Sequence, residues 1–113
     1  MPESTPADRL PTIYALVWRA TEPDATFDAR EFEGRIPRLM TWLAGLHAAG
    51  KLVACGGGGF ETHSGGLTLV RADSVEEAQQ HADASPMNEI GRTDLFVWDV
   101  YWADLAVARA WPR

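Results

Sequence analysis

The fold of this protein is decided by the stretch between residues 50 and 70, which reads Gly50-Lys-Leu-Val-Ala-Cys-Gly-Gly-Gly-Gly-Phe-Glu-Thr-His-Ser-Gly-Gly-Leu-Thr-Leu-Val70. Two short apolar runs, 51–55 and 67–72, flank a glycine-rich segment, and this pattern predicts a β-hairpin. We interpret glycines 56–59 as part of the turn, because glycine permits a wide or bulged hairpin with positive φ angles.

A helical pattern precedes the hairpin. Its apolar residues recur at steps of three and four, which predicts a helix with one apolar stripe. Gly34 and Pro37 disfavour a helix interior, so we expect the regular helix to begin near Arg35, after a separate turn over 28–33, and to end at Gly50. The stripe consists of Phe32, Ile36, Leu39, Met40, Leu43 and Leu46.

A second helix and two further strands, one near each end of the chain, complete the pattern. Ser74 and Glu77 form a capping box that starts a helix running to about Ala84, with Val75, Ala78 and Ala82 as its buried stripe. Strand-like runs occupy 11–20 and 94–102. The order β-α-β-β-α-β predicts an α+β, ferredoxin-like βαββαβ subunit, in which two helices cover one face of a four-stranded antiparallel sheet.

Length and composition indicate one soluble domain. The chain has 113 residues, of which 46% are hydrophobic and 23% charged. We expect a flexible tail over 1–10, the domain over 11–102 and a second tail over 103–113. The net charge of -6 disfavours nucleic acid and anionic membranes as partners. A single cysteine, no signal peptide and no apolar run of about 20 residues predict a cytoplasmic location.

The first and last predicted strands are apolar on both faces, although two helices can cover only one face of the sheet. Ile13, Ala15 and Val17 alternate with Tyr14, Leu16 and Trp18. A solvated second face would alternate apolar with polar residues. We therefore expect a homodimer packed through the open sheet face; the alternative is that the C-terminal tail covers that face.

Several stretches resemble the YCII-related (YciI-like) family of dimeric α/β-barrel proteins. They are 39–56, 65–70, 74–78 and Ser85-Pro86, and the fragment Gly59-Phe-Glu-Thr62 is similar to one branch of the family. The resemblance covers about 11–102. It implies a ferredoxin-like subunit, a homodimer and a cleft between sheet and helices that takes a small molecule.

The resemblance also points to two departures from the family's proposed catalytic pair. That pair is a histidine early in the first helix and an aspartate before the proline that follows the second. Here the histidine position falls on Leu39, or on Arg38 if the helix start shifts by one, and the aspartate position falls on Ser85. Family members with assigned activity resemble lyases that remove halide from chlorinated hydroxyaromatics, and both titratable groups are absent here.

The candidate catalytic residues lie in the predicted hairpin loop. His63 can act as a general base if a carboxylate orients it, and Glu61 is two residues away; the alternative is an exposed loop tip. The glycine run is not a phosphate loop, because it leads into a strand and lacks a following Gly-Lys-Ser/Thr.

The candidate substrate-binding residues come from both helices and the first strand. Arg38 can hold a carboxylate by a bidentate contact, or it can be a solvated arginine at the start of the helix. Trp18 and Trp42 suit flat aromatic ligands, and Ser85 and Asn88 follow the second helix into the same expected cleft.

The remaining titratable residues have structural interpretations. We expect a half-buried His47, a His81 that pairs with Glu77, and a Cys55 that is a small buried residue. No histidine or cysteine pair has the spacing of metal ligands, so we expect no metal and no cofactor.

Two classes of function follow. The first is a non-catalytic, small-molecule-binding or accessory homodimer that kept the cleft and lost the His/Asp pair. The second is a cofactor-free lyase or isomerase, similar to dehydrochlorinases, that acts on a small aromatic or organic acid. A cofactor-free oxygenase of the same barrel type stays open.

Overall fold

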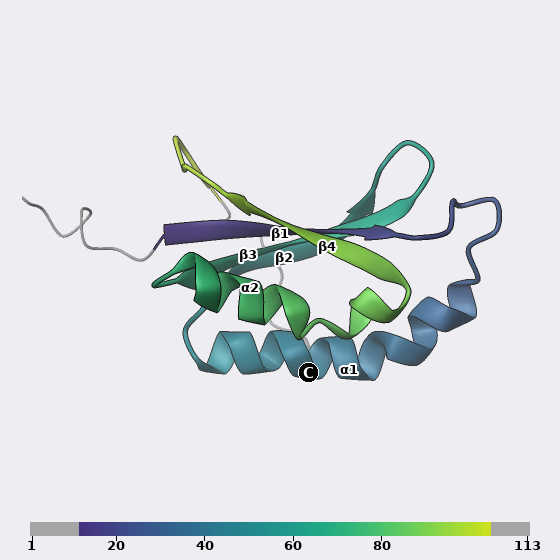
Figure 1. Cartoon of the computed structure of the whole chain (residues 1–113), viewed down its shortest axis with the longest axis horizontal. Helices are drawn as coiled ribbons and strands as arrows, with labels where there is room; N and C mark the ends of the chain where they lie inside the picture. The colour runs from purple at the N-terminus through teal and green to yellow at the C-terminus, as the bar shows by residue number, and fades with distance from the viewer. Residues whose placement is uncertain (1–11, 105–113) are drawn as a thin grey trace, which may run out of the picture.

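A computed structural model describes residues 12–104 and contains one antiparallel sheet with its helices on one face (Figure 1). The sheet order is β2-β3-β1-β4, which confirms the predicted α+β, ferredoxin-like subunit. No helix within the described range is long and apolar enough to cross a membrane. The elements are β1 (Thr12–Ala20), α1 (Ala29–Ala48), β2 (Leu52–Gly59), β3 (Ser64–Ala72), α2 (Val75–Asp83), the 3-10 helix η2 (Pro86–Glu89) and β4 (Gly91–Val97).

The predicted tail over 1–10 lies outside the described residues, as does the greater part of the one over 103–113. Ala103 and Asp104 are described and have no regular structure. The first strand agrees with the expected 11–20 to within a residue.

The register of the central strands determines which side chains meet the helices. Tyr14 pairs with Val70, and Leu16 pairs with Thr68. Side chains alternate along a strand, so these residues and Trp18 share the face that α1 and α2 cover. The main core cluster lies there and consists of Tyr14, Leu16, Leu46, Val70, Ala72, Ala78 and Ala82.

Helix α1 begins six residues earlier than expected. Asp28 caps it by accepting from the backbone N–H of Arg30, and the helix runs through Pro37 without a break. Proline removes the donor that would bond the carbonyl of Glu33. Both residues are exposed, so this carbonyl lies on the solvent side, where water can replace the lost bond. Gly50 follows the helix with a φ of 73°, as a C-terminal stop requires.

Glycines 56–59 form strand rather than turn, so that expectation is wrong. They pair in register with 64–67, and Phe60 N–H donates to the carbonyl of His63 to close the hairpin. No glycine there has a positive φ. At Gly65 a Cβ would lie 2.7 Å from the Phe60 ring and 2.8 Å from the carbonyl oxygen of Trp18, so close packing requires glycine.

The last strand also differs from the expected 94–102. It starts at Gly91, which pairs with Ala20, where a side chain would overlap the Trp18 indole. It ends at Val97, which pairs with Tyr14, and Trp98 N–H makes one further bond, to the carbonyl of Ile13.

Helix α2 starts with the predicted cap. Ser74 Oγ accepts from Glu77 N–H at 3.1 Å, and the Glu77 carboxylate reaches back to Asp73 N–H at 2.9 Å. Ala78 and Ala82 are buried as expected, but Val75 is 49% exposed because it lies in the first turn, beyond the edge of the core. His81 pairs with Glu77 as predicted, at 3.2 Å.

Glu77 also binds Lys51 at 3.1 Å, which links α2 to the start of β2. The hydrogen bond from Asp73, followed by the Lys51 ammonium, lowers the pKa of Glu77 from 4.5 to about 2. A pKa that is lower in the folded state stabilises the fold above pH 4.5, and this stabilisation is lost as the pH falls toward 2.

We predict that Glu77→Gln lowers the free energy of unfolding by about 1 kcal/mol at pH 7. This value is smaller than the pKa shift alone implies, because solvent screens the charge of the partly exposed carboxylate. The loss should be clearly smaller at pH 3, measured by urea unfolding at both pH values. Glu76→Gln, one residue earlier on the exposed side of the helix, is the control and should change little at either pH. An equal loss for Glu77→Gln at both pH values would contradict this account.

Candidate functional site

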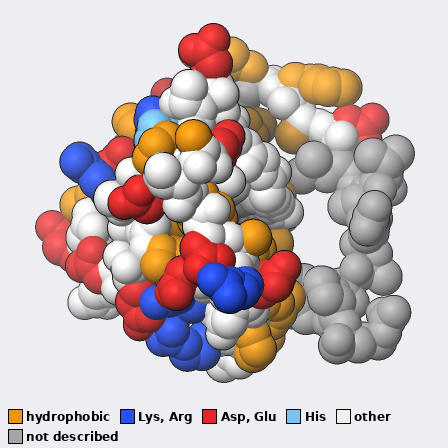
Figure 2. Space-filling model, turned by 90° about the vertical axis from the view of Figure 1, so that its right-hand side faces the viewer, with side chains coloured by type: hydrophobic (Ala, Val, Ile, Leu, Met, Phe, Trp, Pro, Cys, Tyr) orange, Lys and Arg blue, Asp and Glu red, His pale blue; other side chains and the backbone are white. Residues whose placement is uncertain are grey.

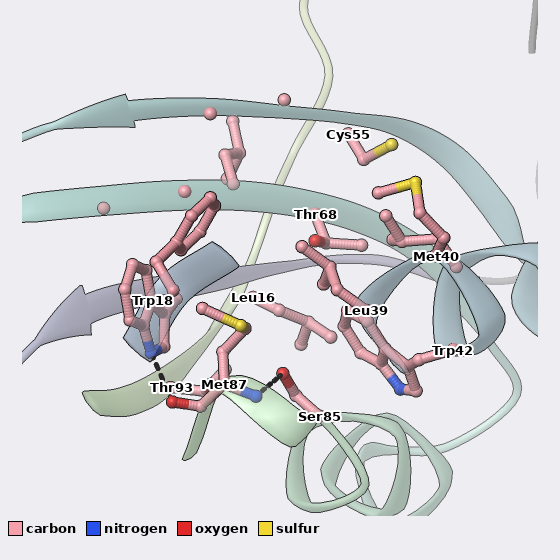
Figure 3. Close-up of a pocket in the computed structure, with 17 residues that line it drawn as sticks. Leu16, Trp18, Leu39, Met40, Trp42, Cys55, Thr68, Ser85, Met87 and Thr93 are labelled. Carbon is pink, nitrogen blue, oxygen red and sulfur yellow. Dashed lines mark hydrogen bonds between the residues drawn. The ribbon is translucent and has the colours of Figure 1, made fainter. Parts of the chain in front are cut away.

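A cavity of about 280 Å³ lies between α1 and the sheet, with η2 along one side (Figure 3). Its walls are almost entirely apolar side chains and glycine backbone. The lining residues are Leu16 and Trp18 from β1; Phe32, Leu39, Met40, Trp42 and Leu43 from α1; Cys55, Gly56 and Gly57 from β2; Gly65, Gly66, Leu67 and Thr68 from β3; and Ser85, Met87 and Thr93.

The cavity explains why the apolar stripe of α1 is only partly buried. Leu43 and Leu46 are buried against the core, whereas Phe32, Leu39 and Met40 are half-buried. Each of these three half-buried residues lines the cavity. Helix α1 therefore borders the cavity from Phe32 to Leu43 and packs against the main core at its C-terminal end, where Leu46 is buried.

A β-bulge in β2 decides which residues of this strand reach the cavity. Leu52 pairs with Val70, but Ala54 pairs with Leu69, so the register shifts by one between them. Because side chains alternate, the shift turns Cys55 to the same face as its partner Thr68, which is the cavity face. Gly57 follows on that face, and a Cβ there would meet no atom within 4 Å.

Trp18 forms the wall next to η2. Its Nε1–H donates to the carbonyl oxygen of Met87 at 2.8 Å, and its ring lies 6.4 Å from the Phe32 ring, centroid to centroid. Figure 3 shows Met87 against the indole, with the chain then leading to Ser85. The two aromatic rings and the Met87 thioether give this wall a flat, apolar surface.

Trp42 and Ser85 line the cavity and also an open outer groove between α1 and α2. Trp42 Nε1–H donates to the carbonyl of His81 at 3.2 Å, which holds the indole across the gap between the helices. Both were predicted as substrate-binding residues, as was Trp18, and the structure brings all three together around one cavity.

Arg38 lies in the outer groove rather than in the cavity. Its guanidinium makes a bidentate contact with Glu89, both bonds 2.8 Å long, and this pairing raises the pKa of Arg38. Glu89 also binds Arg35 at 3.0 Å, and Arg35 binds Glu31. Figure 2 shows acidic and basic side chains interspersed at this end of the molecule. The carboxylate that Arg38 was expected to hold is therefore supplied by the chain itself.

Asn88 also lines the outer groove. Its amide N–H donates to the carbonyl of Ala82 at 2.9 Å, and its Oδ1 accepts from the Thr93 hydroxyl at 2.6 Å. These two bonds tie η2 to the end of α2 and to β4. The Asn88 side chain therefore uses these bonds to hold the cavity wall in position.

His63 and Glu61 lie in the hairpin turn, and neither lines the cavity. His63 Nδ1 lies 3.2 Å from an Arg19 Nη atom and 2.8 Å from Thr62 Oγ1. A guanidinium can only donate, so Nδ1 accepts this bond and the ring proton lies on Nε2. The structure places Arg19 at His63, in the place where a general base needs an orienting carboxylate; Glu61 is exposed.

The two positions on which the family resemblance places the His/Asp pair meet at the cavity. Leu39 and Ser85 both line it, whereas Arg38 does not. Besides the two indole N–H groups and the backbone, the polar groups of the wall are the Ser85, Thr68 and Thr93 hydroxyls and the Cys55 thiol, and no charged side chain among residues 12–104 lines it. Within residues 12–104, no cluster of His, Cys, Asp and Glu side chains could hold a metal ion.

Cys55 is exposed, so the expectation that it is a buried residue is wrong. The strand that carries it lies at the edge of the sheet, so no neighbouring strand covers it. Its thiol is partly desolvated on the cavity side, and burial raises the pKa of Cys55 above its ordinary value of 9.0. Sequence reasoning missed Cys55 and Thr68 as wall residues, because the bulge that aligns them leaves no mark in the apolar pattern.

We predict that Cys55 is alkylated by iodoacetamide more slowly at pH 8 than a cysteine in an unfolded peptide, because less of it is thiolate. The rate should continue to rise above pH 9. Mass spectrometry of the alkylated protein measures it, with Cys55→Ser as the blank. A rate that levels off below pH 8 would show a low pKa and contradict the prediction.

The comparison with family models agrees with this architecture. A model described as the YCII-related domain matches residues 13–100, a span that runs from β1 to beyond β4. No curated protein and no solved structure matches the chain. The match covers well over half of the 113 residues and confirms the resemblance identified in the sequence. The chain belongs to the YCII-related domain family.

Proposed function

We propose that this protein binds a small, uncharged and largely apolar molecule in the cavity, without transforming it. The observation that carries the proposal is a cavity of about 280 Å³ to whose wall residues 12–104 contribute hydroxyls and a thiol but no charged side chain. An apolar ligand gains free energy by leaving water for such a wall. A carboxylate would lose its hydration there without a cation to replace it.

The volume limits the size of the ligand. An apolar cavity of roughly 150 Å³ accepts benzene, and pockets for larger organic ligands start near 300 Å³. The present cavity lies between these values and suits a molecule of about two fused rings. Trp18 and Trp42 add flat surfaces against which such rings can stack.

The wall supports binding better than catalysis. A general acid or base must be able to exchange a proton near neutral pH. Leu39 and Ser85, which occupy the positions of the family's pair, do not titrate in that range, and the raised pKa of Cys55 keeps its thiol protonated. His63 and Glu61 are away from the wall, so the lyase or isomerase alternative lacks a proton carrier inside the cavity.

The second part of the proposal is that the protein acts as a homodimer through the open sheet face. Leu67 and Phe96 are 44% and 54% exposed on the face opposite the helices, next to the half-buried Val17. Leu69 on the same face is 6% exposed and lines a pocket with Trp98 and Trp102, so the described C-terminal segment covers part of this face. A two-fold axis brings the same apolar patch from both copies together, so that a second copy of this chain is chemically matched to the face.

For the ligand, we predict that 1-methylnaphthalene binds at least tenfold more tightly than 1-naphthoate, which has the same rings and a carboxylate. Equilibrium dialysis measures both. Gly57→Leu places a side chain in the open space of the cavity and should weaken 1-methylnaphthalene binding at least tenfold.

The matched control is Gly45→Leu on the exposed side of α1, where a side chain also meets no atom within 4 Å. It should bind like the unaltered protein. Equal weakening by both substitutions, or preference for 1-naphthoate, would overturn the binding proposal.

For the assembly, we predict a mass of twice 12.4 kDa by analytical ultracentrifugation at micromolar concentration. Phe96→Asp places a charge on the open sheet face and should produce monomers. Val75→Asp, at an exposed apolar residue on α2, should leave the dimer intact. A monomeric unaltered protein would refute this part of the proposal alone.

A further inference from the structure

Ser85 is the buried polar residue of the cavity wall. It is 7% exposed, and its Oγ accepts a hydrogen bond from the backbone N–H of Met87 at 3.2 Å. Accepting that bond leaves the hydroxyl proton unused. No described residue accepts that proton, so the Ser85 O–H group can donate a hydrogen bond toward the cavity.

Most of the other side-chain N–H and O–H donors of the wall already have acceptors within the protein. The indole N–H groups of Trp18 and Trp42 donate to the carbonyls of Met87 and His81, and the Thr93 hydroxyl donates to Asn88. The exception is Thr68, whose hydroxyl has no partner among the described residues. Figure 3 shows Thr68 on the sheet and Ser85 on the side of η2. Among the described side chains, the strong free donors of the cavity are therefore two hydroxyls on different walls.

We infer that the Ser85 hydroxyl donates a hydrogen bond to a carbonyl oxygen of the bound molecule, so that the ligand is a flat, uncharged ring system that carries a ketone or quinone oxygen. This inference rests on the proposed function and names the class of its ligand. A carbonyl has acceptor lone pairs and no proton, which complements a hydroxyl that has already used its oxygen as an acceptor.

The position of Ser85 favours an oxygen at one end of the ligand. Ser85 lines both the apolar cavity and the polar outer groove, so it stands at the boundary between them. Rings that fill the space beside Leu16 and Leu39 would place a terminal carbonyl at this boundary. A hydrogen bond to the buried Ser85 hydroxyl discriminates against the same molecule without its oxygen.

The test compares 1-tetralone with tetralin, which has the same fused rings and lacks the carbonyl. We expect the unaltered protein to bind 1-tetralone more tightly by roughly fivefold, the typical value of one net hydrogen bond. Ser85→Ala should abolish this preference. Because the substitution also removes the bond to Met87 N–H, the affinity for both ligands can fall, but their ratio isolates the contact with the carbonyl.

Thr68→Val is the matched control, because it removes the other free hydroxyl at nearly constant shape, and it should keep the preference. Loss of the preference in Thr68→Val together with its retention in Ser85→Ala would overturn the inference. If Ser85→Ala does not fold, the infrared carbonyl band of 1-tetralone bound to the unaltered protein decides: a shift to lower frequency than in hexane supports the bond, and an unshifted band overturns it.

The two proposals fail in different ways. If neither tetralin nor 1-tetralone binds, the proposed function itself is refuted. If both bind with equal affinity, or if Ser85→Ala keeps the preference, the cavity still binds apolar molecules and the assignment of the carbonyl to Ser85 is refuted.

Discussion

The hydrogen bond from Trp18 to the carbonyl of Met87 is the constraint on which the rest of the site depends. It joins β1 to η2 across 69 residues of sequence. It also gives the buried indole N–H an acceptor in place of the water that burial removes. Gly65 and Gly91 lack side chains where the chain passes closest to this residue. With η2 held in place, Met87 and Ser85 lie across an open space from the part of α1 between Phe32 and Leu43, and that space is the cavity.

The cavity is a region where the protein leaves its packing incomplete. Interiors are normally filled at the density of organic crystals, and side chains that border a void lose contacts on one side. Here the stripe of α1 is half-buried where it borders the cavity, and β2 contributes glycine backbone where side chains would fill the gap. A bound molecule can restore the missing contacts, which is why an uncharged apolar ligand is the occupant that fits this wall.

The residues selected from the sequence separate into three groups in the structure. Trp18, Trp42 and Ser85 line the cavity; Arg38 and Asn88 lie in the outer groove; His63 and Glu61 lie in the hairpin turn. The sequence pointed to Ser85 through the family resemblance and to the two tryptophans through their flat aromatic rings. It could not show that Glu89, 51 residues beyond Arg38, neutralises its guanidinium, because an ion pair between distant segments depends on how helices dock. Their functional roles stay predictions.

The sequence by itself determined the element order, the faces of the first strand, the cap of α2 and the family, because alternation, helical spacing and capping are local properties of the chain. The tertiary structure decided where α1 begins, that the glycines extend β2, and that Cys55 and Thr68 share the cavity wall. Each of these depends on a partner far away in sequence: β3 pairs with the glycines, the bulge sets the face of Cys55, and the packing of Phe32 against Trp18 gives the first turns of α1 a place to dock. Local sequence patterns carry no information about such contacts, because these contacts form only when distant segments of the chain pack together.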